Sequence, residues 1–194
     1  MSLYSWIVEA IRNPRELSTI FPSSRFLARK IADQIDFEQP RAIAELGPAD
    51  GALTGPIVRR MHPDSRLLLI EIVDNFCKEL EQKYSDHPKR DAIKILNRSA
   101  EKLDSIIREE NIEGLDYVVS GLPLTTLPDE LSETIIHTVY DCLKPSGRYI
   151  QFQYSRDYKE NIEKVFGPVE LHRVWLNIFP AWVYVADKAN SPGY

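Results

Sequence analysis

The sequence is poor in cysteine and lacks long apolar runs. Only Cys77 and Cys142 occur among its 194 residues, and neither lies in a CxxC motif or a Cys/His cluster. We therefore expect no disulfide framework and no bound metal, and we predict a reduced, intracellular setting. No apolar run reaches the roughly 18 residues of a membrane-spanning helix. The opening stretch MSLYSWIVEAIRNPREL contains no signal-peptide core.

The chain also lacks an excess of positive charge. Its formal net charge is −5, which weakens the case for a dedicated nucleic-acid binder. Hydrophobic residues make up 43% of the composition, which is enough for a full core. The length suits a single domain, so we predict one domain over residues 1–194.

The hydrophobic pattern begins as helical and then alternates between strands and helices. Apolar residues at helical spacing predict an amphipathic helix over 2–12, followed by a connector that extends to residue 22. Ser24 is the expected N-cap of a second helix over 25–36. Short apolar runs predict strands at 41–46, 66–71, 92–96 and 115–120. Helical stretches separate these runs, near 52–61, 74–84, 100–110 and 129–143.

The predicted strands are almost continuously apolar, as expected for parallel strands that are covered on both faces. A fifth strand over 147–155 follows the turn KPSG, and a helix is expected over 157–166. The runs VELHRVWLN and AWVYVADK, joined through Pro180, predict an antiparallel hairpin that closes the sheet. The pattern therefore predicts an α/β fold with a doubly wound, Rossmann-like sheet of seven strands.

The stretch IAELGPADGALTG, residues 43–55, joins the first predicted strand to a helix. Gly47 can adopt backbone angles that a residue with a Cβ disfavours, and Gly51 allows a ligand to approach the backbone closely. The helix that follows directs its free N–H groups at the same space. Ligands of such sheets bind at the carboxyl ends of the strands, so the turn is suited to a nucleoside cofactor.

Two acidic residues flank this space at the ends of neighbouring strands. Glu45 lies two residues before Gly47, and Glu71 lies 71 − 47 = 24 residues after it. A dinucleotide site requires G-x-G-x-x-G, whereas a Rossmann-type methyltransferase tolerates this spacing and uses an acid at each place. An ordinary strand–helix turn with two surface glutamates is the alternative.

Further motifs extend this pattern along almost the whole chain. They are PSSRFLARKIA (22–32), ELGPADGALT (45–54), SGLPL (120–124), KPSGRYIQFQY (144–154) and VWLNIFPAWVY (174–184). Together they resemble the bacterial phospholipid N-methyltransferases, which methylate the amine of phosphatidylethanolamine with S-adenosylmethionine. The chain is more distantly similar to the ribosomal RNA adenine dimethyltransferases.

The resemblance implies a set of site residues. Those expected to bind S-adenosylmethionine are Ser24, Glu45, Gly47, Ala49, Gly51, Glu71, Ile72, Ser99, Ala100 and Ser120. Those expected to contact the substrate are Leu122, Pro123, Leu124, Trp175 and Asn177, with Trp182 on the same hairpin. Tyr154 is expected to orient the amine, and Gly121 to allow close approach of backbone carbonyls. The alternative interpretation is that Tyr154, Trp175 and Trp182 are packed core residues without a role in binding.

The chain departs from the pattern of the family it resembles at two cofactor positions. Ala49 occupies the middle place of the family's G-x-G-x-G turn, and we expect it to fit with a negative φ. Ser99 replaces the aspartate of the family's G-D-A, with Glu101 as an alternative acceptor for the adenine. Because of these departures, a non-catalytic protein that binds S-adenosylmethionine remains an alternative interpretation.

The adenine dimethyltransferases carry N-L-P-[YF], whose asparagine and aromatic ring hold a flipped base. Here Gly121 and Leu124 take those places, so methylation of RNA is disfavoured, although RNA and small molecules remain alternative substrates. A lipid substrate implies a cytoplasmic protein that is attached peripherally to an anionic membrane surface, at the inner face of the membrane. Residues 1–30 carry five basic and two acidic side chains, so the segment 1–22 is predicted to be a membrane anchor or a lid.

Overall fold

The computed structural model describes residues 24–176 and 180–189. The predicted helix over 2–12, its connector to residue 22, and Asn177 lie outside the described residues. No helix within the described ranges is long and apolar enough to cross a membrane.

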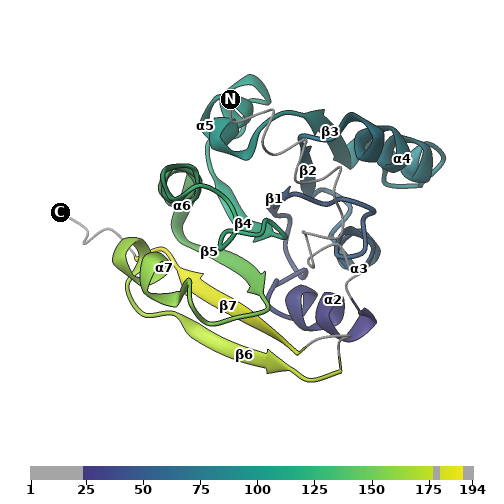
Figure 1. Ribbon diagram of the computed structural model, residues 1–194. Coiled ribbons are helices and arrows are strands. Elements are labelled where there is room, and N and C mark those ends of the chain that lie inside the picture. Colours follow the sequence, from purple (N-terminus) through teal and green to yellow (C-terminus); the bar gives the residue numbers. More distant parts are fainter. Residues whose placement is uncertain (1–23, 177–179, 190–194) are drawn as a thin grey trace.

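One seven-stranded sheet forms the centre of the molecule (Figure 1). Its strands are β1 (Ala42–Leu46), β2 (Arg66–Glu71), β3 (Ile93–Asn97), β4 (Leu115–Ser120), β5 (Leu143–Gln153), β6 (Glu170–Val174) and β7 (Ala181–Asp187). They lie in the order β3-β2-β1-β4-β5-β7-β6. Strands β1 to β5 are parallel, and β7 pairs antiparallel with both β5 and β6. The predicted parallel sheet and C-terminal antiparallel hairpin are therefore confirmed.

Helices cover both faces of the sheet, as the doubly wound prediction requires. One apolar cluster joins the sheet to α2 (Arg25–Ala32), α3 (Thr54–Arg60) and α4 (Asp74–Tyr84). The other joins it to α5 (Leu103–Glu109), α6 (Asp129–Cys142) and α7 (Lys159–Phe166). Two short 3₁₀ helices, η1 (Arg90–Ala92) and η2 (Ala100–Lys102), flank β3. Because both faces are covered, β1, β2 and β4 are largely buried, which explains their almost continuous apolar runs.

The KPSG segment differs from its prediction. It is not a turn before the strand but a bulge within β5, because Leu115 pairs with Leu143 while Tyr117 pairs with Arg148. Ser146 takes a left-handed φ of 60° in this bulge. A Cβ on Gly147 would lie 2.8 Å from the Lys144 carbonyl oxygen, so the tight bulge requires a glycine there.

The carboxyl ends of the strands share one edge with the start of α2. Ser24 caps α2 as predicted, since its Oγ accepts a hydrogen bond from the Leu27 N–H at 3.2 Å. Strand β6 is antiparallel to β7, which is antiparallel to β5, so β6 runs in the direction of β5 and also ends at this edge. The Ser24 hydroxyl donates to the Leu176 carbonyl oxygen at 2.8 Å and joins α2 to the residues after β6.

Candidate functional site

The glycine turn leaves β1 through three residues with positive φ. The φ angles are 68° at Gly47, 48° at Ala49 and 76° at Gly51. The Gly47 N–H donates to the Ile70 carbonyl of β2 at 2.9 Å, and the Gly51 N–H donates to the Pro48 carbonyl at 2.8 Å. The expected negative φ at Ala49 is therefore wrong. The turn imposes a left-handed residue at this place, and alanine adopts that conformation at a cost of about 1–2 kcal/mol.

Gly47 and Gly51 are also required by their neighbours. A Cβ on Gly47 would lie 2.8 Å from the Leu122 side chain, and one on Gly51 would lie 2.9 Å from Leu80. Gly47 thus lets the turn pack directly against the SGLPL loop that follows β4. Gly121 of that loop donates its N–H to the Leu46 carbonyl at 2.9 Å, and its Cβ position lies 3.0 Å from the Gly47 carbonyl oxygen.

Glu71 links the end of β2 to the glycine turn. Its Oε2 accepts from the Ala49 N–H at 3.1 Å, and its Oε1 accepts from the Val73 N–H at 2.9 Å. Burial raises the pKa of this carboxyl group, and the backbone donors act in the opposite direction. Each carboxylate oxygen has a second lone pair, so Glu71 can still accept from two ligand hydroxyl groups. Ile72 follows it and is half-buried.

Glu45 lies inside the protein at the end of β1. Its side chain is fully buried, and neither carboxyl oxygen reaches hydrogen-bond geometry with residues 24–176 or 180–189, although the Thr54 hydroxyl lies near enough to affect its pKa. Burial raises its pKa to about 8, and the Thr54 hydroxyl and the Lys83 charge oppose this shift. The alternative of two surface glutamates is therefore wrong. A buried carboxyl group without a partner is suited to a donor supplied by a ligand or a water molecule.

Two predicted adenine-site residues lie after β3. Ser99 is the N-cap residue of η2, and Ala100 is buried at its start. The neighbouring Arg98 side chain is turned toward α5, where it pairs with Glu109 at 3.0 Å. Glu101, the alternative acceptor, lies 3.7 Å from the Lys102 ammonium group.

The SGLPL loop contains both accessible and buried residues. Ser120 is fully buried, and its Oγ accepts from the Leu122 N–H at 3.3 Å. Leu122 and Pro123 are half-buried, whereas Leu124 is fully buried in the cluster beneath α6. The loop therefore presents Leu122 and Pro123 more openly than Leu124, whose position is that of a core residue.

Sequence reasoning missed two glutamines that hold this loop. Gln151 and Gln153 are buried on β5, and their Nε2 atoms donate to the Leu122 carbonyl oxygen at 3.0 and 3.1 Å. Both donors serve one acceptor, so this carbonyl is already bonded within the protein. The signal was visible in QFQY, because two amides at i and i+2 lie on the same face of an apolar strand.

The remaining predicted residues lie farther along the same edge. Tyr154 follows β5, is half-buried, and packs edge-to-face on Phe152 with ring centroids 5.9 Å apart. Trp175 follows β6 and is 64% exposed, and the Arg173 guanidinium lies 3.5 Å from its ring centroid. Strand β7 separates β5 from β6, so the strand ends that carry Tyr154 and Trp175 are about 10 Å apart across the sheet.

Comparison with known proteins identifies the family. No protein-family model matches the chain. The chain is 30% identical over 154 residues to the ornithine lipid N-methyltransferase of Singulisphaera acidiphila, covering 77% of this chain and 79% of that protein. The chain belongs to the family of this lipid N-methyltransferase. The predicted class of S-adenosylmethionine-dependent methyltransferases is thereby confirmed.

Solved structures support the fold of this family member. The 1,6-didemethyltoxoflavin-N1-methyltransferase of Burkholderia thailandensis, solved with S-adenosylhomocysteine, is 15% identical and superimposes with a TM-score of 0.69. That likeness covers 97% of this chain and 88% of the other. An S-adenosylmethionine-dependent O-methyltransferase of Thermotoga maritima is 16% identical with a TM-score of 0.65, covering 100% and 74%. At these identities the likeness establishes the fold.

The residues of the turn fit the cofactor of the lipid N-methyltransferase family, S-adenosylmethionine. Gly47 and Gly51 keep the backbone open to a close ligand, and Glu71 retains lone pairs for hydroxyl groups. The unpartnered carboxyl oxygens of Glu45 match a cofactor that carries an ammonium group. The fit is poorest at Ala49, where a Cβ occupies a left-handed position.

Proposed function

We propose that this methyltransferase N-methylates the primary amine of a membrane-lipid head group. The observation that carries the proposal is the 30% identity to an ornithine lipid N-methyltransferase over most of both chains. The SGLPL loop supports it, because Gly121 and Leu124 offer neither a side-chain acceptor nor an aromatic ring to a nucleobase.

The cofactor is assigned to the turn and the strand ends around it. Glu71 would accept from the ribose hydroxyl groups, and Glu45 would act near the methionine ammonium group. Ser99 and Ala100 would border the adenine, and Ile72 would contact the adenine ring. Ser24 and Ser120 would lie near the methionine part of the cofactor. When bound, S-adenosylmethionine supplies a methyl group on a positively charged sulfur, which needs no further activation.

The protein's own contribution is to align the amine and exclude water. The head-group ammonium must first release a proton to solvent, and its free lone pair then forms the new N–C bond as the C–S bond breaks. Tyr154 is proposed to orient the amine by a hydrogen bond or by cation–π attraction. Gly121 is proposed to keep the backbone close to the transferred methyl group, and Leu122, Pro123 and Trp175 to border the lipid.

Two lipids are candidates for the acceptor. Phosphatidylethanolamine is the substrate that the sequence motifs predict, and ornithine lipid is the substrate that the relative's name favours. Both present a primary amine on a polar head group. Because such lipids lie in a bilayer, we further propose peripheral attachment to the cytoplasmic face of the membrane, with residues 1–22 as an anchor or a lid.

The proposal is tested with methyl-labelled S-adenosylmethionine and mixed liposomes. One set contains phosphatidylethanolamine, a second contains ornithine lipid, and a parallel tube contains RNA. We expect label in the lipid fraction, and the set that is labelled identifies the head group. Measurable cofactor binding with label only in RNA, or in no acceptor, would contradict the proposal.

Residue roles are tested in the same assay. Tyr154→Phe removes one hydroxyl, and we expect a decrease in turnover of tenfold or more with unchanged binding of S-adenosylhomocysteine. Tyr140→Phe, on α6, is the matched control and should retain turnover. Equal turnover of Tyr154→Phe and the control would show that Tyr154 is a packing residue.

A further inference from the structure

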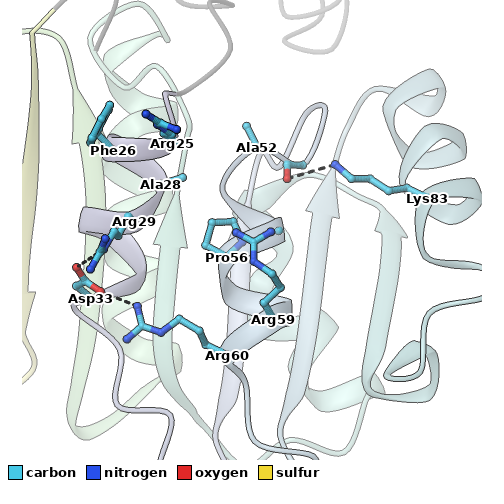
Figure 2. A pocket seen from close by; sticks show the side chains of 12 residues that line it. Arg25, Phe26, Ala28, Arg29, Asp33, Ala52, Pro56, Arg59, Arg60 and Lys83 are labelled. Carbon is cyan, nitrogen blue, oxygen red and sulfur yellow. Dashed lines mark hydrogen bonds and ion pairs between the residues drawn. The ribbon is translucent and has the colours of Figure 1, made fainter. Parts of the chain in front are cut away.

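A basic groove runs between α2 and α3 on the outer surface of the molecule. It encloses about 1040 Å³ and is lined by charged side chains from α2, α3 and α4 (Figure 2). These are Arg25, Arg29, Arg59, Arg60 and Lys83, with Asp33 as the one acidic residue of the lining. Five cations against one anion give this groove a local charge of +4 in a chain whose net charge is −5.

The internal pairs of the groove leave positive charge unbalanced. Asp33 pairs with Arg60 at 2.6 Å and lies 3.9 Å from Arg29. Lys83 donates to the carbonyl oxygens of Asp50 at 2.9 Å and Gly51 at 3.5 Å, and these neutral acceptors leave its charge in place. The guanidinium groups of Arg25 and Arg59 have no hydrogen bond or ion pair with other residues of 24–176 and 180–189. Both can therefore take an anionic ligand.

Exposed apolar side chains lie beside one end of the groove. Phe26 is 41% exposed, and Trp175 and Leu176 are each 64% exposed. They are the exposed large hydrophobic residues of the described part of the chain. Figure 2 shows Arg25 and Phe26 at the end of the groove toward which the strands point. The hydrogen bond from Ser24 to the Leu176 carbonyl holds the residues after β6 next to the start of α2.

The groove borders the proposed cofactor site and shares Gly51 with it. It reaches the stretch 43–55 through Gly51, Ala52 and Gly55, and its lining includes none of Glu45, Gly47 or Glu71. It nevertheless opens at the carboxyl edge of the sheet, so an occupant would be held beside the site at which the amine must arrive.

We propose that this groove binds the phosphate of an anionic membrane lipid, while Phe26, Trp175 and Leu176 enter the bilayer interface. The inference deepens the proposed function and rests on it, because a lipid substrate requires the carboxyl edge of the sheet to face the membrane. Cations with adjacent exposed aromatic and aliphatic side chains match a membrane surface, where phosphates lie above an apolar layer. A nucleic acid would offer no apolar partner to Leu176.

The experiment measures binding of the full chain to vesicles by sedimentation, without methyl donor. Vesicles of phosphatidylcholine with roughly 30% phosphatidylglycerol are compared with vesicles of phosphatidylcholine alone. The first composition gives the surface a negative charge of roughly physiological size. We expect the affinity of the double variant Arg25→Gln/Arg59→Gln for the anionic vesicles to be lower than that of the wild type by at least about tenfold. The control Arg108→Gln/Lys164→Gln removes the same charge from α5 and α7, on the opposite face of the sheet, and should bind like the wild type.

A second readout separates this inference from the catalytic proposal. Turnover of detergent-dispersed lipid amine should be the same for Arg25→Gln/Arg59→Gln and the wild type, because neither arginine belongs to the proposed active site. Leu176→Ala should weaken vesicle binding by severalfold at any salt concentration, since it removes apolar contact alone. Equal losses in both charge variants, or salt-dependent binding to RNA without binding to vesicles, would overturn the groove as a lipid site.

Discussion

At the scale of single residues, Ala49 is where the chain departs from an ideal cofactor turn. Its φ of 48° is one that a residue with a Cβ adopts at a cost of about 1–2 kcal/mol. Ala49→Gly would remove this strain but add about 0.5–1 kcal/mol of unfolded-chain entropy. We expect a net gain in unfolding free energy of about 0.5–1 kcal/mol, measured by denaturant unfolding.

The matched control for this variant is Ala52→Gly, three residues farther along the same turn. Ala52 is not among the positive-φ residues, so its replacement should lower the unfolding free energy by up to about 1 kcal/mol. If both variants lose stability equally, Ala49 is not strained.

Glu45 gives the protein a distinctive dependence on pH. Its pKa rises from 4.5 to about 8 on folding because burial penalises the charged form. The folded state therefore holds this proton more tightly than the unfolded state. The stability that depends on it is complete below about pH 4.5 and decreases as pH rises toward 8.

Glu45→Gln keeps the shape of the side chain and removes this titration. We expect its unfolding free energy to exceed that of the wild type by an amount that grows between pH 5 and pH 8, reaching on the order of a few kcal/mol. Unfolding in urea at several pH values, without cofactor, measures the difference. A difference that stays constant over this range would mean that Glu45 is ionised in the fold.

At the scale of elements, strand β5 positions the loop that follows β4. Gln153→Met would remove one of the two donors to the Leu122 carbonyl, while Gln151 keeps the other. The loss of one buried hydrogen bond costs about 1 kcal/mol, and the loop should then move more freely. We expect kcat/KM for the lipid amine to fall about fivefold to tenfold, with S-adenosylhomocysteine affinity changed less than about twofold.

The control is Gln82→Met, an exposed glutamine on α4, which should leave both quantities unchanged. Titration calorimetry measures the affinity, and the labelled-methyl assay measures the rate. Parallel losses in affinity and rate would show that Gln153 supports the cofactor turn instead of the loop alone.

The elements also show what the sequence could and could not predict. Apolar runs predicted β2 and β4 at their observed bounds, because burial on both faces leaves a clear pattern, and the helix expected near 74–84 is α4. The bulge in β5 was missed, since KPSG has the composition of a turn and only pairing with β4 fixes its place. The strain at Ala49 and the partners of Gln151 and Gln153 also escaped, because they depend on contacts between residues far apart in the chain.

At the scale of the whole molecule, the strands of the proposed cofactor site and the C-terminal hairpin belong to one sheet, and we ask whether they unfold together. Strands β7 and β6 extend the same sheet as β1 and β2, and the apolar cluster beneath α2 includes Val183 together with Ile43. Continuous pairing and a shared core predict that the sheet unfolds in one step. This is the physical content of the single domain predicted for residues 1–194.

The tryptophans allow a direct test of that prediction. In a Trp6→Phe variant the fluorescence reports only Trp175 and Trp182, which lie at the hairpin, whereas circular dichroism reports the helices throughout. S-adenosylhomocysteine at 100 times its Kd should add about 2.7 kcal/mol to the unfolding free energy. Strands β4 and β5 lie between β7 of the hairpin and the strands β1 and β2 that carry the proposed cofactor residues Glu45 and Glu71. Both probes should therefore shift by this same amount only if unfolding is cooperative. A shift seen by circular dichroism but not by fluorescence would mean that the hairpin unfolds separately, contrary to a single domain.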